Sequence, residues 1–254
     1  MTGKVKKFNF WFNVFILAGM FIAVVITNVY KLQQPDARRF MLVLASIGAL
    51  TGVVNTVLSA NGNILTFLFG FIDVTVASIV AFDSSIRPVG EPVWGNFILH
   101  AFYFLPMQFV GWWQWRRRGA GVKSRVRARR LTPRLWGILV FALAAGTLTA
   151  YLVLSAIGGD KSSGSAFHAI ILFDALVFVL NVLGQVLMSF AYMEQWIVWI
   201  SVNVFSICLW VGKAASSPDA SYTVVMVIKY SFYLLNSLNG LRIWSESSRE
   251  KGEA

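Results

Sequence analysis

Residues 102–115 read FYFLPMQFVGWWQW, and residues 232–244 read FYLLNSLNGLRIW. At a shift of 130 residues the two FY pairs coincide, and Pro106 falls on Asn236. Apolar helices seldom share aromatic pairs and amides at matching positions, so the match indicates an internal repeat. Chance similarity between such helices is the alternative. We therefore expect the chain to contain two related units.

The similarity extends from these stretches over three consecutive apolar segments of each unit. The same shift places Asp73 on Asn203, and a slightly different shift places Asn55 on Asn181. Equivalent segments lie four segments apart, and every crossing of a membrane reverses the chain, so equivalent helices point the same way. This requires one connecting helix and predicts a 3+1+3 arrangement of parallel repeats, which is a known transporter architecture.

The composition places these segments in a lipid bilayer. Of the 254 residues, 57% are hydrophobic and 13% are charged, whereas a soluble domain carries about 25% charged residues. The mean hydropathy is +0.67. A soluble protein of this size has too little interior to bury so much apolar side chain, but a bilayer solvates the outer faces of its helices. The expected fold class is therefore an all-α integral membrane protein.

The apolar runs are long enough for about eight transmembrane helices, because a helix needs about 20 apolar residues to cross the hydrocarbon core. Turn residues and charges separate the runs, as at Asn61-Gly62-Asn63. The first run precedes the repeats as one extra N-terminal helix, which either spans the membrane or lies on its surface. The expected spans cover residues 8–30, 40–60, 63–82, 97–115, 135–157, 167–190, 196–211 and 222–244.

These segments divide the chain into five parts. The extra helix and its loop take residues 1–39, and the first three-helix repeat takes residues 40–115. A basic cytoplasmic loop and the linker helix follow at 116–166. The second three-helix repeat occupies residues 167–244, and residues 245–254 form a cytoplasmic tail.

The positive charge of the chain is concentrated in one loop. The formal net charge is +11, and nine of the 22 Lys and Arg lie between Arg116 and Arg134. A basic loop between apolar runs is typical of the cytoplasmic side of a membrane protein, so we expect it to contact lipid headgroups and no nucleic acid. An even number of spans puts both termini on that side as well. Lys31, Arg38 and Arg39 are the exception, since they would lie outside.

Polar side chains recur at helical spacing within the spans, which places them on shared helix faces. A polar group at membrane depth needs a partner or a cavity, so we expect these faces to line a substrate site between the repeats. The alternative is that the amides join helices and that the Trp residues form interfacial belts. The candidate substrate-binding residues are Gln108, Trp112, Asn181, Gln185, Trp196, Trp199, Asn203, Tyr233, Asn236 and Asn239.

The chemistry of these side chains favours a small polar guest with a flat ring. Amides both donate and accept hydrogen bonds, so they suit hydroxyls and carboxamides. Indole faces suit flat rings and attract cations by about 0.5 to 2 kcal/mol each. A sugar that bears a flat, positively charged heterocycle would match both kinds of side chain.

Three charged residues lie inside the expected spans, namely Asp73, Asp174 and Lys229. Such residues usually mark ion pathways or internal pairs, and an Asp174–Lys229 pair is one interpretation. His100 shares a helix stripe with Gln108, so it either lines the cavity or bonds to a neighbour.

The sequence offers little for catalysis. His100 and His168 are its only histidines, and Cys208 is its only cysteine. No Gly-rich phosphate loop, nucleophile elbow or metal-ligand pair is present. We therefore expect a transporter that needs no cofactor and no metal. A membrane enzyme that acts on a lipid-linked substrate, and a structural or signalling membrane protein, are the alternatives.

The residues from about Gly48 to Trp244 resemble the PnuC family of nicotinamide riboside transporters. The resemblance rests on YFLPMQFVGWWQW at 103–115 and on residues 174–199, which end in WIVW and match the family's W-x-x-W motif. It implies a fold similar to that of the SWEET sugar carriers and a homotrimer. The first expected helix lies outside the clear resemblance.

The same resemblance implies facilitated diffusion of nicotinamide riboside through the inner membrane of a bacterium. A cytoplasmic kinase that phosphorylates the arriving riboside would make uptake one-way. A carrier of thiamine, riboflavin or deoxynucleosides is the alternative within transport. We assign the ribose and carboxamide contacts to Gln108, Asn203, Asn236 and Asn239. We assign the ring contacts to Trp196 and Trp199, with Trp112 or Tyr233 as further candidates, and a gate is the alternative role for residues 196–199.

Overall fold

The computed structural model describes residues 3–33, 39–86, 97–158, 165–216 and 220–249. These residues are helical apart from turns, loops and one isolated bridge between Arg129 and Tyr192, which confirms the all-α fold class. The π-helical turn η1 runs directly into α5, so the two form one continuous helix. The elements are α1 (Gly3–Leu32), α2 (Arg39–Ala60), α3 (Thr66–Ile86), η1 (Leu99–Phe104), α5 (Leu105–Arg117), α6 (Pro133–Gly158), α7 (Ser165–Ser189), α8 (Gln195–Ser216) and α9 (Ala220–Arg249).

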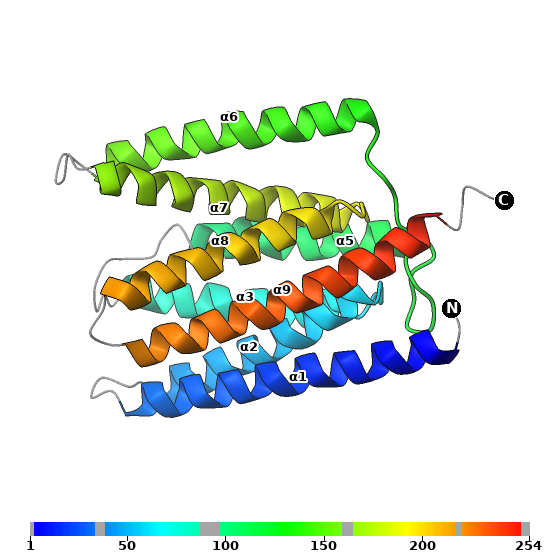
Figure 1. The fold of residues 1–254 in the computed structure, drawn as a ribbon, viewed down its shortest axis with the longest axis horizontal. Coiled ribbons are helices and arrows are strands. Elements are labelled where there is room, and N and C mark those ends of the chain that lie inside the picture. The colour runs from blue at the N-terminus through cyan, green and yellow to red at the C-terminus, as the bar shows by residue number, and fades with distance from the viewer. Residues whose placement is uncertain (1–2, 34–38, 87–96, 159–164, 217–219, 250–254) are drawn as a thin grey trace.

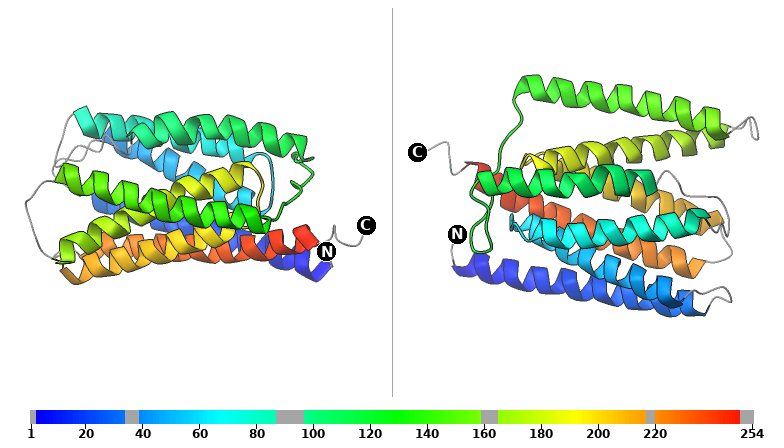
Figure 2. Two further views of the ribbon diagram at one scale, coloured as in Figure 1. Left: turned by 90° about the horizontal axis from the view of Figure 1, so that it is seen from above. Right: turned by 180° about the vertical axis from the view of Figure 1, so that it is seen from behind.

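The helices form one bundle in which the long axes run roughly side by side (Figures 1 and 2). Helices α2, α3 and α5 pack in succession, and so do α7, α8 and α9. The two groups meet where α2 packs on α9 and where α5 packs on α7. Two parallel repeats would make this symmetric pair of contacts. The 3+1+3 repeat, and the domain boundaries drawn from it, stay predictions.

The extra N-terminal helix is a member of this bundle. Its stretch Lys7–Tyr30 is 24 residues long and apolar enough to cross a membrane. Ile16 and Met20 of α1 form a buried cluster with Val53 and Val57 of α2, and α1 also packs against α9. A helix packed along two others fits a span better than it fits a helix lying apart on the membrane surface.

Five of the described helices are long and apolar enough to cross a membrane. The other three expected spans coincide with η1–α5, α8 and α9. Helix α8 contributes the shorter apolar stretch Gln195–Val211. Helix α9 is less apolar because it carries Lys229, Asn236 and Asn239. These three segments have shorter or less apolar stretches than the other five, because part of their surface faces polar side chains inside the bundle and not lipid.

The outer surface of the bundle is apolar, as contact with lipid requires. In the span Pro133–Ala156 of α6, none of the residues is buried within the chain. Large side chains such as Phe40, Phe102 and Phe141 are at least 70% exposed. An exposed apolar surface of this size marks a site of interaction. In a multi-pass membrane protein the acyl chains of the lipids contact it.

The N-terminus, the C-terminus and the basic loop lie at the same end of the bundle, hereafter the basic end (Figure 1). The loop crosses this end and ties two turns together. The Val126 N–H donates to the Gly62 carbonyl at 2.9 Å, and the Arg129 N–H donates to the Ala191 carbonyl at 2.8 Å. Gly62 has a φ of +67°, which glycine adopts without steric cost. The turn predicted at Asn61–Asn63 is therefore confirmed.

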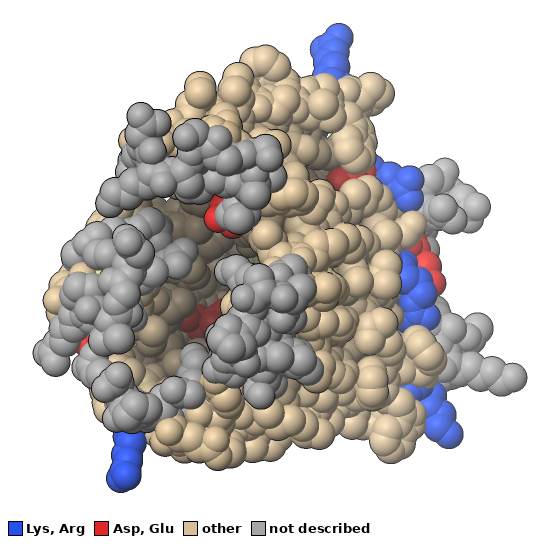
Figure 3. Space-filling view, turned by 60° about the vertical axis from the view of Figure 1, so that its left-hand side comes forward, with Lys and Arg blue, Asp and Glu red and all other residues tan. Residues whose placement is uncertain are grey.

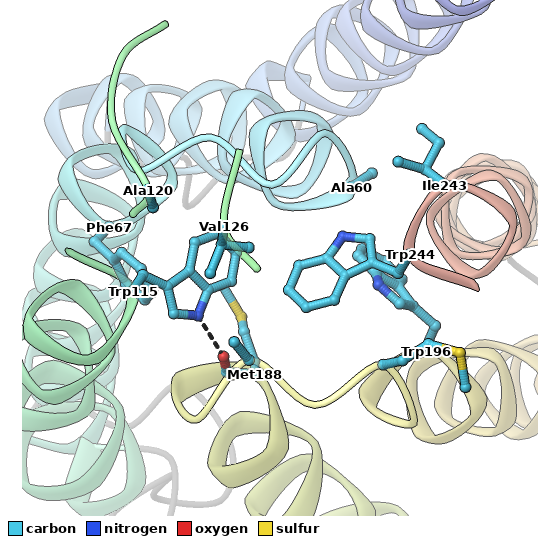
Figure 4. Packing of buried hydrophobic residues seen from close by; sticks show 11 residues of the cluster. Ala60, Phe67, Trp115, Ala120, Val126, Met188, Trp196, Ile243 and Trp244 are labelled. Carbon is cyan, nitrogen blue, oxygen red and sulfur yellow. Dashed lines mark hydrogen bonds between the residues drawn. The ribbon is translucent and has the colours of Figure 1, made fainter. Parts of the chain in front are cut away.

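An aromatic cluster closes the bundle beside this loop (Figure 4). The Trp115 ring lies 4.9 Å from the Phe67 ring and 5.3 Å from the Trp244 ring. Trp115 Nε1 donates to the Met188 carbonyl at 2.7 Å, and Trp244 Nε1 donates to the Ser59 carbonyl at 3.2 Å. These bonds join α5 to α7 and α9 to α2, so the cluster holds the two groups of helices together at the basic end.

Candidate functional site

A cavity of about 230 Å³, hereafter the central cavity, lies among α2, α7, α8 and α9. Ser59, Met188 and Trp196 place one side of it near the helix ends at the basic end. Amide, hydroxyl and aromatic side chains dominate its wall. The lining residues are Asn55, Thr56, Ser59, Asn181, Gln185, Met188, Trp196, Trp199, Val202, Asn203, Tyr230, Tyr233, Asn236 and Ser237.

The structure brings most of the sequence-predicted site residues together at this cavity. They come from helices far apart in the chain, and their faces converge although no spacing rule relates one helix to another. The seven that line it are Asn181, Gln185, Trp196, Trp199, Asn203, Tyr233 and Asn236.

The other three predicted residues lie elsewhere. Trp112 is 42% exposed, and the Arg116 guanidinium lies 5.3 Å from its ring centre, as in an interfacial Trp. Gln108 is buried, and its Nε2 donates to the Phe104 carbonyl at 3.2 Å. Asn239 Oδ1 accepts a hydrogen bond from Arg242 Nη2 at 2.8 Å. None of the three is in the described lining of the central cavity.

Two polar atoms of the central cavity stand out because they have no partner within the described part of the chain. Asn236 Nδ2 donates to the Thr56 carbonyl at 3.1 Å, which orients the amide and leaves Asn236 Oδ1 buried without a partner. Trp196 Nε1 is also buried without a partner. An unsatisfied buried polar group costs about 1 to 3 kcal/mol. Because Trp196 and Asn236 both line the central cavity, they are the first candidates to bond to a guest.

The two indoles are held by glycines on neighbouring helices. A Cβ added at Gly240 of α9 would lie 2.6 Å from Cε3 of Trp196, and one added at Gly184 of α7 would lie 3.1 Å from Cζ2 of Trp199. Trp196 is 3% exposed, so it is no interfacial belt residue. Close backbone approach fixes both ring planes at the wall of the cavity.

Five polar residues of the lining are not among the sequence-predicted site residues, namely Asn55, Thr56, Ser59, Tyr230 and Ser237. One signal for Asn55 was present, because the internal repeat pairs it with Asn181, and both line the central cavity. Ser237 accepts a hydrogen bond from Asn203 Nδ2 at 3.1 Å. Serine and threonine are common in membrane helices and often bond to their own backbone, so no pattern distinguished Thr56, Ser59 and Ser237.

Two further cavities lie on the far side of the central cavity from the basic end. One of about 210 Å³ shares Tyr233 with the central cavity and shares Lys229 with the other. The other, hereafter the vestibule, measures about 410 Å³ and is lined by Asp73, His100 and Lys229 among small apolar residues. Figure 3 shows that the molecule is hollowed at this end, with acidic side chains visible inside the hollow.

The internal charges are thus arranged differently from the Asp174–Lys229 pair considered above. Lys229 shares the vestibule with Asp73 and interacts with it electrostatically. Asp174 is exposed on α7. The sequence could not decide between these partners, because both acids lie in apolar helices with no spacing relation to Lys229.

Comparisons with known proteins place the chain in a family. The family described as Nicotinamide mononucleotide transporter matches residues 42–246. The Nicotinamide riboside transporter PnuC of Haemophilus influenzae is 32% identical over 239 residues, which are 93% of this chain and 88% of that protein. The protein of the same name from Neisseria mucosa is 30% identical over 207 residues, which are 80% of this chain and 72% of that protein.

A solved structure has a similar fold. The crystal structure of the Vitamin B3 transporter PnuC superposes with a TM-score of 0.63 at 28% sequence identity. The match covers 93% of this chain and 92% of that chain. The similarity therefore extends over the whole bundle and includes the helices that line the central cavity.

Proposed function

This chain belongs to the Nicotinamide mononucleotide transporter family. We propose that it carries nicotinamide riboside across a membrane, which is the function stated in the names of its PnuC relatives. It is a multi-pass membrane transporter and not an enzyme. The observation that carries the substrate proposal is the pair of unpartnered polar atoms, Trp196 Nε1 and Asn236 Oδ1, in a cavity walled by indoles and amides. They offer a donor and an acceptor to the hydroxyls or the carboxamide of a riboside.

The lining of the central cavity favours the riboside over its phosphorylated form. The family description names the mononucleotide, whereas the names of the relatives state the riboside. The described lining holds no Lys, Arg or His. A phosphate carries about −1.5 to −2 charges at neutral pH, and burying a charge without a partner is strongly unfavourable. A mononucleotide would therefore lack a counter-ion in this cavity.

Each part of the riboside has matching groups. The pyridinium ring suits the faces of Trp196 and Trp199, which attract a flat cation. The ribose hydroxyls and the carboxamide suit Asn203, Asn236 and Gln185, because amides donate and accept. Asn55, Asn181 and Tyr233 complete the proposed site. Gln108, Trp112 and Asn239 are left out of it because they do not line the cavity.

We propose facilitated diffusion as the mechanism. The described lining of the central cavity has no acid that could bind a coupling ion, and rocking of the helix groups about the cavity would suffice for alternating access. A cytoplasmic kinase that phosphorylates the riboside would trap it. The concentration of Lys and Arg in the basic loop supports a cytoplasmic basic end in a bacterial inner membrane. A homotrimer, which the PnuC resemblance implies, is part of the same proposal.

Proteoliposomes test this mechanism directly. Labelled nicotinamide riboside is expected to enter vesicles that contain the protein until the inner and outer concentrations are equal, because an uncoupled carrier cannot do work. Imposing a proton or sodium gradient is expected to leave that end point unchanged. Accumulation above the outside concentration under either gradient would show ion coupling and contradict the proposal.

The substrate is tested by competition on the purified protein. Nicotinamide riboside is expected to raise the melting temperature, because a ligand that binds the folded state stabilises it. Thiamine, riboflavin and deoxynucleosides at the same concentration are expected to displace it poorly. Equal displacement by thiamine would identify a broader vitamin carrier, and the absence of any shift would favour a protein that does not bind the riboside.

Replacing Trp112 with alanine is expected to leave riboside affinity within about twofold of the wild type. The side chain lies on the outer face of α5 next to Arg116, away from the central cavity. Isothermal titration calorimetry of the purified variant measures the effect. A tenfold loss would return Trp112 to the binding site and show that the cavity extends to α5 during transport.

A further inference from the structure

The vestibule holds charged groups that the proposed riboside site does not use. Its wall combines Asp73 of α3, His100 of η1 and Lys229 of α9 with small side chains such as Ala45 and Ala77. Ionisable residues at membrane depth are costly and usually functional. The irregular helix η1 adds to this, because π-helical turns are frequent at functional sites.

The carboxylate of Asp73 is seated against the backbone of α2. A Cβ added at Gly52 would lie 2.8 Å from Asp73 Oδ2, and one added at Gly48 would lie 3.7 Å from Asp73 Oδ1. Glycine at position 52 thus leaves the space that the carboxylate occupies. The carboxylate therefore packs against the backbone of α2 in the wall of the vestibule.

The cavity that holds this acid adjoins the central cavity through shared lining residues. Lys229 lines both the vestibule and the neighbouring cavity of about 210 Å³, and Tyr233 lines that cavity and the central one. Asp73 interacts electrostatically with Lys229. Lys229 Nζ lies 5.7 Å from the centre of the Tyr233 ring. The vestibule, which contains Asp73, is therefore linked through shared lining residues to the cavity that contains Trp196.

The indole faces of the central cavity attract a cationic ring, but the described lining of that cavity provides no counter-charge. The described lining of that cavity contains no Asp or Glu. A pyridinium riboside carries one positive charge, and a fixed acid attracts it over several ångströms in a partly dry cavity. Among the described residues that line the three cavities, Asp73 is the only acid.

Resting on the proposed function, we propose that the vestibule is a second, outer binding site for the cationic ring of the riboside, with Asp73 as its counter-ion. The ring binds there first and then moves past Tyr233 into the central cavity. Lys229 neutralises Asp73 while the vestibule is empty, and it competes with the incoming ring. A lysine suits this part because its flexible stem lets the ammonium move aside.

The competing explanation is that Asp73 and Lys229 form a structural pair between α3 and α9. The two explanations predict different directions for the change in riboside affinity when Asp73 or Lys229 is replaced. If the carboxylate recognises the ring, removing Asp73 weakens binding of a cation and removing Lys229 strengthens it. If the pair is structural, losing either member leaves an uncompensated charge and damages the protein in the same direction.

The experiment measures Kd by calorimetry for two ligands and four proteins. The ligands are nicotinamide riboside and its neutral 1,4-dihydro form, which keeps the ribose and the carboxamide but has no positive charge. The proteins are the wild type, Asp73→Asn, Lys229→Gln and the matched control Asp174→Asn, whose acid is exposed on α7. Melting temperatures without ligand report whether each variant folds.

We expect Asp73→Asn to weaken binding of the cationic riboside about tenfold, Lys229→Gln to strengthen it, and Asp174→Asn to change it by less than about twofold. Binding of the neutral form is expected to change by less than about twofold in every variant. The proposal is also supported if the wild type binds only the cationic form and the variants rank in the same order of affinity for it. If Asp73→Asn fails to fold, the affinity of Lys229→Gln for the cationic riboside tests the proposal, and a higher affinity than in the wild type supports it.

Equal losses in Asp73→Asn and Lys229→Gln, or equal changes for both ligands, would overturn the proposal and establish a structural pair. An unchanged Kd in Asp73→Asn would overturn it too. These outcomes are distinct from a failure of the proposed function, in which the wild-type protein binds neither form of the riboside.

Discussion

Replacing Trp196 with alanine is expected to weaken nicotinamide riboside binding by about a hundredfold and to abolish measurable uptake at low substrate. The side chain supplies a ring face and the unpartnered Nε1 donor to the central cavity. Losing a cation–ring contact and a hydrogen bond together costs roughly 3 kcal/mol, which is about a hundredfold in Kd.

The same change is expected to destabilise the protein, because Trp196 also belongs to the aromatic cluster at the basic end, where its ring lies 6.1 Å from that of Trp244. Truncating a buried aromatic side chain to alanine costs about 3 to 5 kcal/mol. Calorimetry with the riboside and a thermal melt without it separate the two effects.

Trp196→Phe separates the hydrogen bond from the packing. It keeps an aromatic ring but removes the Nε1 donor, so we expect a loss of affinity of about tenfold with a small change in melting temperature. Trp136→Ala on α6 is the matched control, because that indole is 37% exposed and lines none of the three cavities. Full affinity in Trp196→Ala, with the protein folded, would remove the indole from the site.

Replacing Gly240 with alanine is the second change for which we expect a large effect. The new methyl group would lie 2.6 Å from Cε3 of Trp196 and would push the indole from its place at the cavity wall. Forcing an extra methyl group into a packed interior costs about 1 to 3 kcal/mol. We expect a lower melting temperature and a loss of riboside affinity of at least about tenfold, although position 240 does not line the central cavity.

Gly137→Ala on α6 is the control for this change. No atom of another side chain or helix lies within 4 Å of the position that its Cβ would take. The same substitution there is expected to leave affinity unchanged and to preserve or raise stability, because alanine favours helix over glycine by up to about 1 kcal/mol. If Gly240→Ala bound the riboside normally at an unchanged melting temperature, the proposed fixation of the Trp196 ring would be wrong.

The two changes test one physical idea from two sides. Trp196→Ala removes the group that contacts the substrate, whereas Gly240→Ala keeps that group and moves it. If binding depends on where the indole is held, both variants lose affinity, and the Gly240 variant does so without losing any contact atom. Uptake into proteoliposomes then shows whether the lost affinity also limits transport.

Much of the fold could be predicted from composition and charge. The low charge content indicated a lipid environment, and the concentration of Lys and Arg after Trp115 predicted an even number of crossings before that loop. The structure confirms that the loop and both termini share one end (Figure 1). It also confirms the turn at Gly62, because that signal depends on local backbone geometry alone.

The candidate site could be predicted in part. Trp196 and Trp199 were identified by a motif, and Asn181, Gln185, Asn203 and Asn236 by their spacing; all of them line the central cavity. Gln108 and Trp112 followed the same spacing rule on α5, yet neither of them lines that cavity. The rule was equally valid in both cases, so spacing alone could not separate them.

The sequence by itself determined that this protein is an all-helical membrane protein, that its basic loop lies with both termini, and that certain polar residues share helix faces. Only the tertiary structure decided which of those faces meet, that α2, α7, α8 and α9 enclose the central cavity, and that Lys229 lies with Asp73. The physical reason is that helical periodicity fixes directions relative to one helix axis. The rotation of each axis toward its neighbours is set by packing among residues that are far apart in the chain.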